Sequence, residues 1–286
     1  MLLDPWGPYG GPILAQTVAH EFNHATQAAD DWHEIGVSFE MSTVYVEQLF
    51  GDACAECIAD FQTRPEWSLL WYDDYETWYM YGAALYMHFL CDYYFHGDES
   101  FLPALWRAAR NTPDLLTNVP NLVDGVNTIL APINATFRES VELFARWRYY
   151  TDSRDDGQHF RHRQLGWGKQ LPFLTEAELT IPAITLADGE YVVNPAPMLL
   201  GSVYLEVERD QEGQASFGLS LEIPADPSIQ WVVQALPGIA LGSDGDRVNP
   251  SAARVAFDPN GKRTLVITLL PVTGSIRTTS PESDIQ

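Results

Sequence analysis

The segment His20-Glu21-Phe22-Asn23-His24 has the pattern H-E-x-x-H, in which residues able to bind a metal recur at helical spacing. On a helix, His20 and His24 lie on the same face, one turn apart. Two imidazoles in this arrangement can hold one zinc ion. Glu21 lies about 100° further round, where it can contact a water on the metal. The pattern is typical of a zinc peptidase with Glu21 as general base; the alternative is two surface histidines on a solvated helix.

A catalytic zinc usually has three protein ligands and one open position, so a third ligand must follow the histidines. Asp30 and His33 are the nearest candidates. If the helix runs on, however, Asp30 lies about 280° round from His20, and a residue such as His33 is more often on the surface. Glu40 is the stronger candidate because it lies sixteen residues beyond His24 on a second predicted helix. A helical hairpin would bring Glu40 beside the histidines.

Glu47 lies on the same predicted helix face as Glu40, with Val44 between them. A carboxylate there could accept a proton from an imidazole that binds the metal, and so fix the orientation of the ring. The alternative is that Glu47 is an exposed acid.

The elements that must position these residues are helices. Apolar residues repeat every three to four positions from Ile13 to Ala25, which predicts a helix through about Ala29. Ser38 can cap a second helix that Gly51 ends. Further helices are expected at about residues 53–60, 75–95, 100–109 and 135–150.

From Leu171 onwards, short β-like runs are separated by turn signals such as Asp188-Gly189 and Asn260-Gly261. This spacing predicts an antiparallel β-sandwich. We therefore expect a multidomain α plus β protein. Residues 1–165 would form a mainly helical zincin-like metallopeptidase domain, 166–278 a β-sandwich and 279–286 a polar tail.

The pattern of these motifs resembles a known class of enzymes. His20-Glu21-x-x-His24 followed by Glu40-Met41-Ser42-Thr43 is similar to the gluzincins, in which a downstream E-x-x-[AST] supplies the third ligand. The chain more closely resembles the secreted metallopeptidases related to immune inhibitor A that are common in myxobacteria. That resemblance extends over residues 13–110 and includes an element that begins Tyr81-Gly82-Ala83.

The resemblance implies a zinc-dependent endopeptidase with His20, His24 and Glu40 as zinc ligands and Glu21 as general base. In aminopeptidase-N-like gluzincins, a Y-x-x-G-A tyrosine stabilises the oxyanion, and Tyr79 matches it. The alternative for Tyr79 is one more aromatic residue in a buried helix. Zincins normally have a β-sheet before the motif, so we expect either that the N-terminal part of the protein is missing from this chain or that substrate is held in another way.

Composition excludes several other functions. The formal net charge of −23 argues against binding nucleic acid, which needs a basic surface. No run of 18 apolar residues is present, so we expect no membrane insertion. A zinc ribbon needs a second cysteine pair beside Cys54 and Cys57, and the sequence has none. We therefore expect buried thiols, or one disulfide between two of the three cysteines Cys54, Cys57 and Cys91. The first residues carry no signal peptide, yet the resemblance and the acidity favour a secreted or periplasmic protein.

The expected partner is a peptide or protein substrate, and the partner of the predicted sandwich is unknown. The rival hypothesis is a non-catalytic secreted surface or adhesion protein with a zincin-derived module. A structural metal site would be closed by four protein ligands, whereas a catalytic site leaves one position for water.

Overall fold

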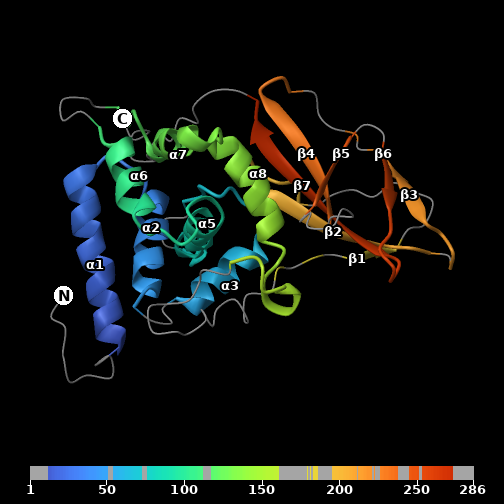
Figure 1. The fold of residues 1–286 in the computed structure, drawn as a ribbon, viewed down its shortest axis with the longest axis horizontal. Helices are drawn as coiled ribbons and strands as arrows, with labels where there is room; N and C mark the ends of the chain where they lie inside the picture. Colours follow the sequence, from blue (N-terminus) through green and yellow to red (C-terminus); the bar gives the residue numbers. More distant parts are fainter. Residues whose placement is uncertain are drawn as a thin grey trace.

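The structure is a computed structural model, and it describes residues 12–50, 54–72, 76–111, 117–160, 179, 181, 183–185, 195–210, 212–220, 222, 226–237, 245–250 and 253–272. The helices precede the strands in the sequence (Figure 1). The described α-helices are α1 (Pro12–Asp30), α2 (Gly36–Gln48), α3 (Ala55–Thr63), α4 (Tyr79–Gly82), α5 (Ala84–Phe89), α6 (Phe101–Ala109), α7 (Leu122–Leu130) and α8 (Phe137–Trp147).

The described strands form two sheets. They are β1 (Ala183–Thr185), β2 (Ser202–Glu208), β3 (Ser216–Leu219), β4 (Ile229–Leu236), β5 (Asp246–Val248), β6 (Ala253–Ala256) and β7 (Lys262–Pro271). Five of them form one sheet in the order β1-β2-β7-β4-β5, antiparallel except that β1 runs parallel to β2. Strands β3 and β6 form a separate antiparallel pair.

The prediction of a helical zincin-like domain followed by a β-sandwich is wrong. The described chain is a small α/β protein whose two sheets do not close into a sandwich. One face of the larger sheet packs against α8, where the hydroxyl of Tyr204 donates to the carbonyl of Ala145 at 2.6 Å. On the other face, the β3–β6 pair contributes Phe217 and Val255 to an apolar cluster. The alternating sequence predicts strands, but it does not say whether a helix or a second sheet covers them.

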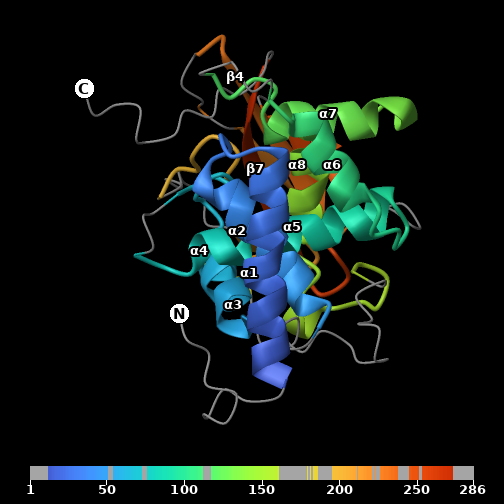
Figure 2. The same ribbon diagram turned by 90° about the vertical axis from the view of Figure 1, so that its left-hand side faces the viewer.

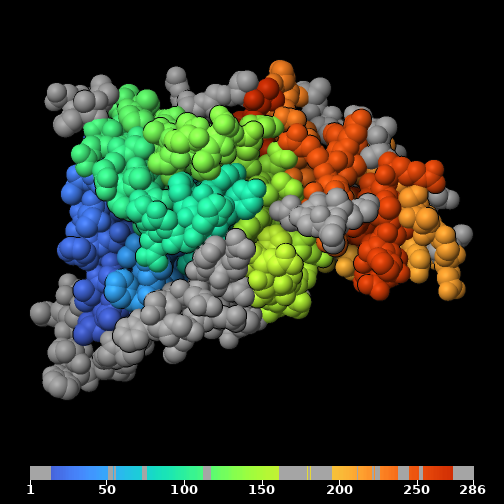
Figure 3. All heavy atoms as spheres, viewed as in Figure 1, coloured from blue at the N-terminus to red at the C-terminus, as the bar shows by residue number. Residues whose placement is uncertain are grey.

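The helices share one large apolar core, to which the sheet also contributes Val232 and Leu270. The division of the chain into two domains between residues 165 and 166 stays a prediction. Figure 3 shows the strands at one end of the molecule and α1 at the other.

The helix predicted for residues 75–95 is divided in the structure. It consists of α4, α5 and a π-helical turn, Leu90–Tyr94, and residues 73–75 lie outside the described part. Gly82 ends α4 against α3, where a Cβ atom would lie 2.0 Å from the carbonyl oxygen of Cys57. Cys54 and Cys57 form a disulfide, and Cys91 is a buried thiol. None of the described helices is both long enough and apolar enough to cross a membrane.

Helices α1 and α2 form the hairpin that carries the predicted metal ligands. Helix α2 is buried on most sides and lies inside the helical layer, in contact with α1, α4 and α5. Helix α1 lies at the edge of the molecule and faces the viewer in Figure 2. Its inner face packs on α2 and is polar, with Gln16 and Gln27 buried, while Phe22 on its outer face is 70% exposed.

Candidate metal centre

The α1–α2 hairpin brings His20, His24 and Glu40 together, as expected from their spacing. The Nε2 atoms of the two histidines lie 3.1 Å apart, and each lies 3.5 Å from Oε2 of Glu40. An ion with tetrahedral ligands at about 2.0–2.1 Å would need ligand atoms about 3.3–3.4 Å apart. The three atoms are therefore spaced to share one metal ion of zinc's size.

The outer nitrogens of both rings have partners that leave Nε2 as the metal-facing atom. Nδ1 of His20 lies 3.0 Å from Oε2 of Glu47, and Nδ1 of His24 lies 2.9 Å from Oε1 of Gln27. Since a carboxylate and an amide oxygen can only accept, each Nδ1 carries a proton. In the neutral rings, both Nε2 atoms then present lone pairs to the same point.

The carboxylate of Glu40 completes a group that needs a cation. Its Oε2 atom is buried and has no hydrogen bond of good geometry among the described residues. Two imidazole lone pairs and a carboxylate cannot satisfy one another unless a proton or a metal ion lies between them. This donor set of two nitrogens and one oxygen suits zinc and also other transition metals.

The protonation of the metal-free group reflects the same need. Burial opposes the charged form of His20, but Glu40 and Glu47 outweigh burial and raise its pKa to about 9. Burial also opposes the charged form of His24, and Glu40 again outweighs it and raises the pKa. Burial favours the neutral form of Glu40, but the two histidines lower the pKa of its carboxyl. The site therefore attracts positive charge in spite of its burial.

Sequence reasoning missed a polar network that holds His24. Gln27 donates from Nε2 to the hydroxyl of Ser42 at 2.7 Å and to the carbonyl of Phe39 at 3.1 Å. The hydroxyl of Thr43 donates to Oε1 of Gln27 at 3.0 Å. These bonds fix the amide that accepts from His24. The only sequence signal was a glutamine three residues after His24, one turn along the same helix.

Glu21 lies next to His20 on α1 and is exposed to solvent. Trp32 is 74% exposed beside the ring of Phe39, which packs against His24. The surface beside His24 is therefore partly apolar.

The alternative third ligands lie elsewhere. Asp30 forms an ion pair with Arg110, which follows the last residue of α6. His33 is largely exposed, with Nδ1 3.6 Å from Oδ1 of Asp31. Neither belongs to the group of potential metal ligands found among the described residues.

Tyr79 lies in the core. Its side chain is fully buried, its ring packs against Phe61 and Trp67, and its hydroxyl donates to the carbonyl of Trp67 at 3.0 Å. Burial raises the pKa of this phenol above its ordinary value. We leave Tyr79 out of the proposed chemistry because these contacts are those of a packing residue.

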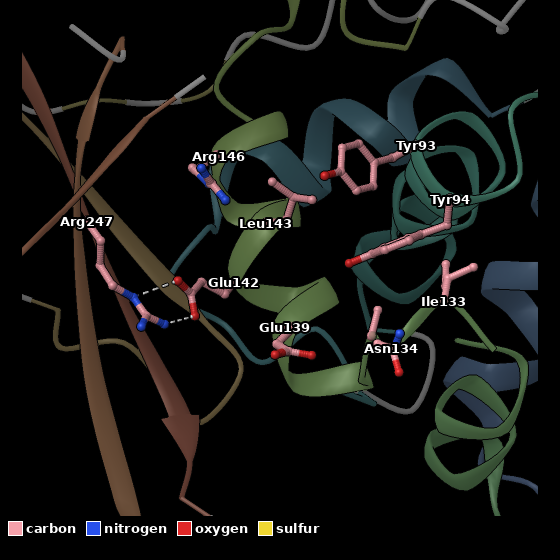
Figure 4. A pocket seen from close by; sticks show the side chains of 10 residues that line it. Tyr93, Tyr94, Ile133, Asn134, Glu139, Glu142, Leu143, Arg146 and Arg247 are labelled. Carbon is pink, nitrogen blue, oxygen red and sulfur yellow. Dashed lines mark hydrogen bonds and ion pairs between the residues drawn. The ribbon is translucent and has the colours of Figure 1, made fainter. Parts of the chain in front are cut away.

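A cavity of about 420 Å³ lies away from the metal group, between α8, the π-helical turn and β5 (Figure 4). Tyr93 and Tyr94 line one side, and Arg247 on the other side binds the carboxylate of Glu142 with Nε at 3.0 Å. No potential metal ligand of the His20 group contributes to it.

Comparison with known proteins adds no relative: no protein-family model, no curated protein and no solved structure matches this chain. The geometry of the site therefore carries the functional argument alone.

Proposed function

We propose that this protein is a zinc-dependent peptidase, secreted or periplasmic, that hydrolyses internal peptide bonds. The observation that carries the proposal is the convergence of two Nε2 atoms and one buried carboxylate oxygen within 3.1–3.5 Å of one another. His20, His24 and Glu40 would hold the ion. When bound, zinc would polarise the scissile carbonyl and lower the pKa of water.

Glu21 provides the acid–base step. It adjoins a ligand on the exposed side of α1, which is the position of a general base in an H-E-x-x-H helix. Its carboxylate would take the proton of the attacking water and return it to the leaving amine. An exposed carboxylate beside a half-buried ligand set suits this role because it can reach both water and substrate.

The ligand count favours catalysis over the rival adhesion hypothesis. A closed structural site would need a fourth protein ligand, but the group found among the described residues has three members. Two of the alternatives are otherwise engaged, since Asp30 pairs with Arg110 and Cys54 with Cys57. In the proposed mechanism, the fourth position is left for water and substrate.

The test is Glu21→Gln beside the wild type, with both proteins loaded with zinc. We expect equal zinc content and a fall of about 10²-fold or more in the cleavage of a quenched fluorescent peptide library. Glu56→Gln, an exposed glutamate on α3, is the matched control and should keep full activity. Full activity in Glu21→Gln would contradict the mechanism. Zinc binding without peptide cleavage by the wild type would favour the structural module.

A further inference from the structure

A second buried group of oxygen-bearing side chains lies apart from the His20 site. Asp31 and Glu34 come from the connection between α1 and α2, and Asn111 and Asn118 come from the connection between α6 and α7. The side chain of Asp31 is 1% exposed, and Glu34 and Asn111 are 6% and 8% exposed. Two carboxylates and one amide are thus removed from water together, with Asn118 half-buried beside them.

These four residues form a closed ring of neighbours. The amide nitrogen Nδ2 of Asn111 lies 2.8 Å from Oδ2 of Asp31 and 2.9 Å from Oδ1 of Asn118. Asn118 in turn lies close enough to Glu34 to lower its pKa, and Asp31 lies close enough to raise it. The four side chains are therefore neighbours, and the Asn118 side chain reaches the Glu34 carboxylate.

Three of the oxygens in this group have no hydrogen bond of good geometry among the described residues, namely both carboxylate oxygens of Glu34 and Oδ1 of Asn111. The side chains of Asn118 and Ser38 and the backbone N–H of Leu122 lie near the Glu34 carboxylate and lower its pKa, but none of them carries a positive charge. Asp31 has one ion-pair partner among the described residues. Nδ1 of His33, a residue that is 44% exposed, lies 3.6 Å from Oδ1 of Asp31. Burial and the charge of Asp31 raise the pKa of Glu34 to about 7. A buried carboxylate without a counter-charge is costly, so the group calls for a cation.

We propose that Asp31, Glu34, Asn111 and Asn118 bind a calcium ion. The set offers only carboxylate and amide oxygens, which are the ligands that calcium prefers and that transition metals do not. Its two negative charges match a divalent ion. A half-turn of the Asn111 amide would replace Nδ2 by Oδ1 opposite Asp31 and Asn118, and the two orientations have almost the same shape.

The ion would connect two parts of the molecule that hold the metal hairpin in place. Asp31 and Glu34 lie between His24 and Glu40 in the chain, whereas Asn111 and Asn118 lie next to the ends of α6 and α7. Calcium would therefore fix the turn that sets the distance from α1 to α2. This inference is independent of whether the protein is a peptidase.

The experiment measures calcium binding to the zinc-loaded full chain by equilibrium dialysis, and Tm by calorimetry, with magnesium at the same ionic strength as reference. We expect about one calcium ion per chain. At one hundred times Kd, Tm should rise by about 5–10 °C. Glu34→Gln keeps the shape of the side chain but removes its charge. It should weaken calcium binding at least tenfold and have a calcium-free Tm no lower than that of the wild type. Glu56→Gln is the control and should behave as the wild type.

Absence of bound calcium in the wild type would overturn the proposal, as would wild-type affinity in Glu34→Gln. Asn111→Ala provides a second test that changes no charge. It should also bind calcium at least tenfold more weakly. Unchanged calcium affinity in that variant would show that calcium does not bind at this site.

Discussion

Nδ1 of His20 lies 3.0 Å from Oε2 of Glu47, a residue 27 positions later in the chain. The contact expected for Glu47 from its helix position is therefore present. Glu47 contacts Nδ1 of His20, whereas Nε2 of the same ring faces Glu40. A carboxylate in this position holds the ring in one tautomer and increases the electron density on Nε2.

Glu47→Ala should weaken zinc binding by about 10–100-fold while the fold is kept, because His20 loses the partner that orients it. Titration against a chromophoric chelator measures the affinity, and far-UV circular dichroism checks the fold. Unchanged zinc affinity in Glu47→Ala would mean that the hydrogen bond does not help to hold the ligand.

Glu40→Ala should lose zinc altogether at concentrations where the wild type binds about one ion per chain, because two imidazoles alone make a weak site. Metal content by mass spectrometry after gel filtration is the measurement. Asp30→Ala, which removes a carboxylate nearer to His24 in the sequence, is the matched control and should keep its zinc. Retention of zinc by Glu40→Ala would move the third ligand to Asp30 or His33.

His88 should make the protein sensitive to acid. The ring is buried, its Nε2 donates to Oε1 of Gln48 at 2.8 Å, and burial lowers its pKa to about 3. Between pH 6.5 and about 3 the unfolded chain binds a proton that the folded chain does not, so the free energy of unfolding falls as the pH falls. At pH 5 this effect is about 2 kcal/mol.

Urea unfolding of the wild type and His88→Gln at pH 7.5 and pH 5 tests this effect. The variant should lose less stability than the wild type between the two pH values. Because both proteins share every other titrating group, the difference between them isolates His88. An equal loss in both would show that His88 is protonated in the folded protein.

Gly82→Ala should destabilise the helical layer. The added Cβ would lie 2.0 Å from the carbonyl of Cys57 and 2.5 Å from Cβ of Phe61, so α3 and α4 would have to separate. We expect a loss of about 3 kcal/mol in the free energy of unfolding. Gly218→Ala on β3 is the control, because a Cβ there meets nothing within 4 Å. Equal stability of the two variants would contradict the close packing.

The metal group was predictable because it depends on local periodicity. His20 and His24 follow from one helix, and Glu40 follows from a second helix and a short connection. The partner of His24 was not predictable in the same way. Gln27 acts through Ser42 and Thr43 of the other helix, and such a network depends on how deeply the two helices interlock.

The fold of the second half was predicted only in part. Some of the β-like runs expected from Leu171 onwards do form strands, as in β2, β4 and β7, because their apolar and β-branched residues suit a sheet. The strand sequences do not indicate which element covers each face of the sheet. One face is covered by α8, which contributes Ala145 to the apolar cluster there. Helix α7 was hidden in a passage rich in Pro and Asn, although Asn121 and Asp124 form a capping box at its start.

The three candidate metal ligands and both of their outer partners lie within the two helices of one hairpin. Joining nearby segments of a chain costs little loop-closure entropy, since that cost grows only slowly with loop length. A metal ion could therefore assemble the hairpin before the sheet has formed, and its binding energy would then contribute to folding. Helix α1 lies at the edge of the molecule, where a bound ion would hold it in place as surrounding side chains hold a buried helix.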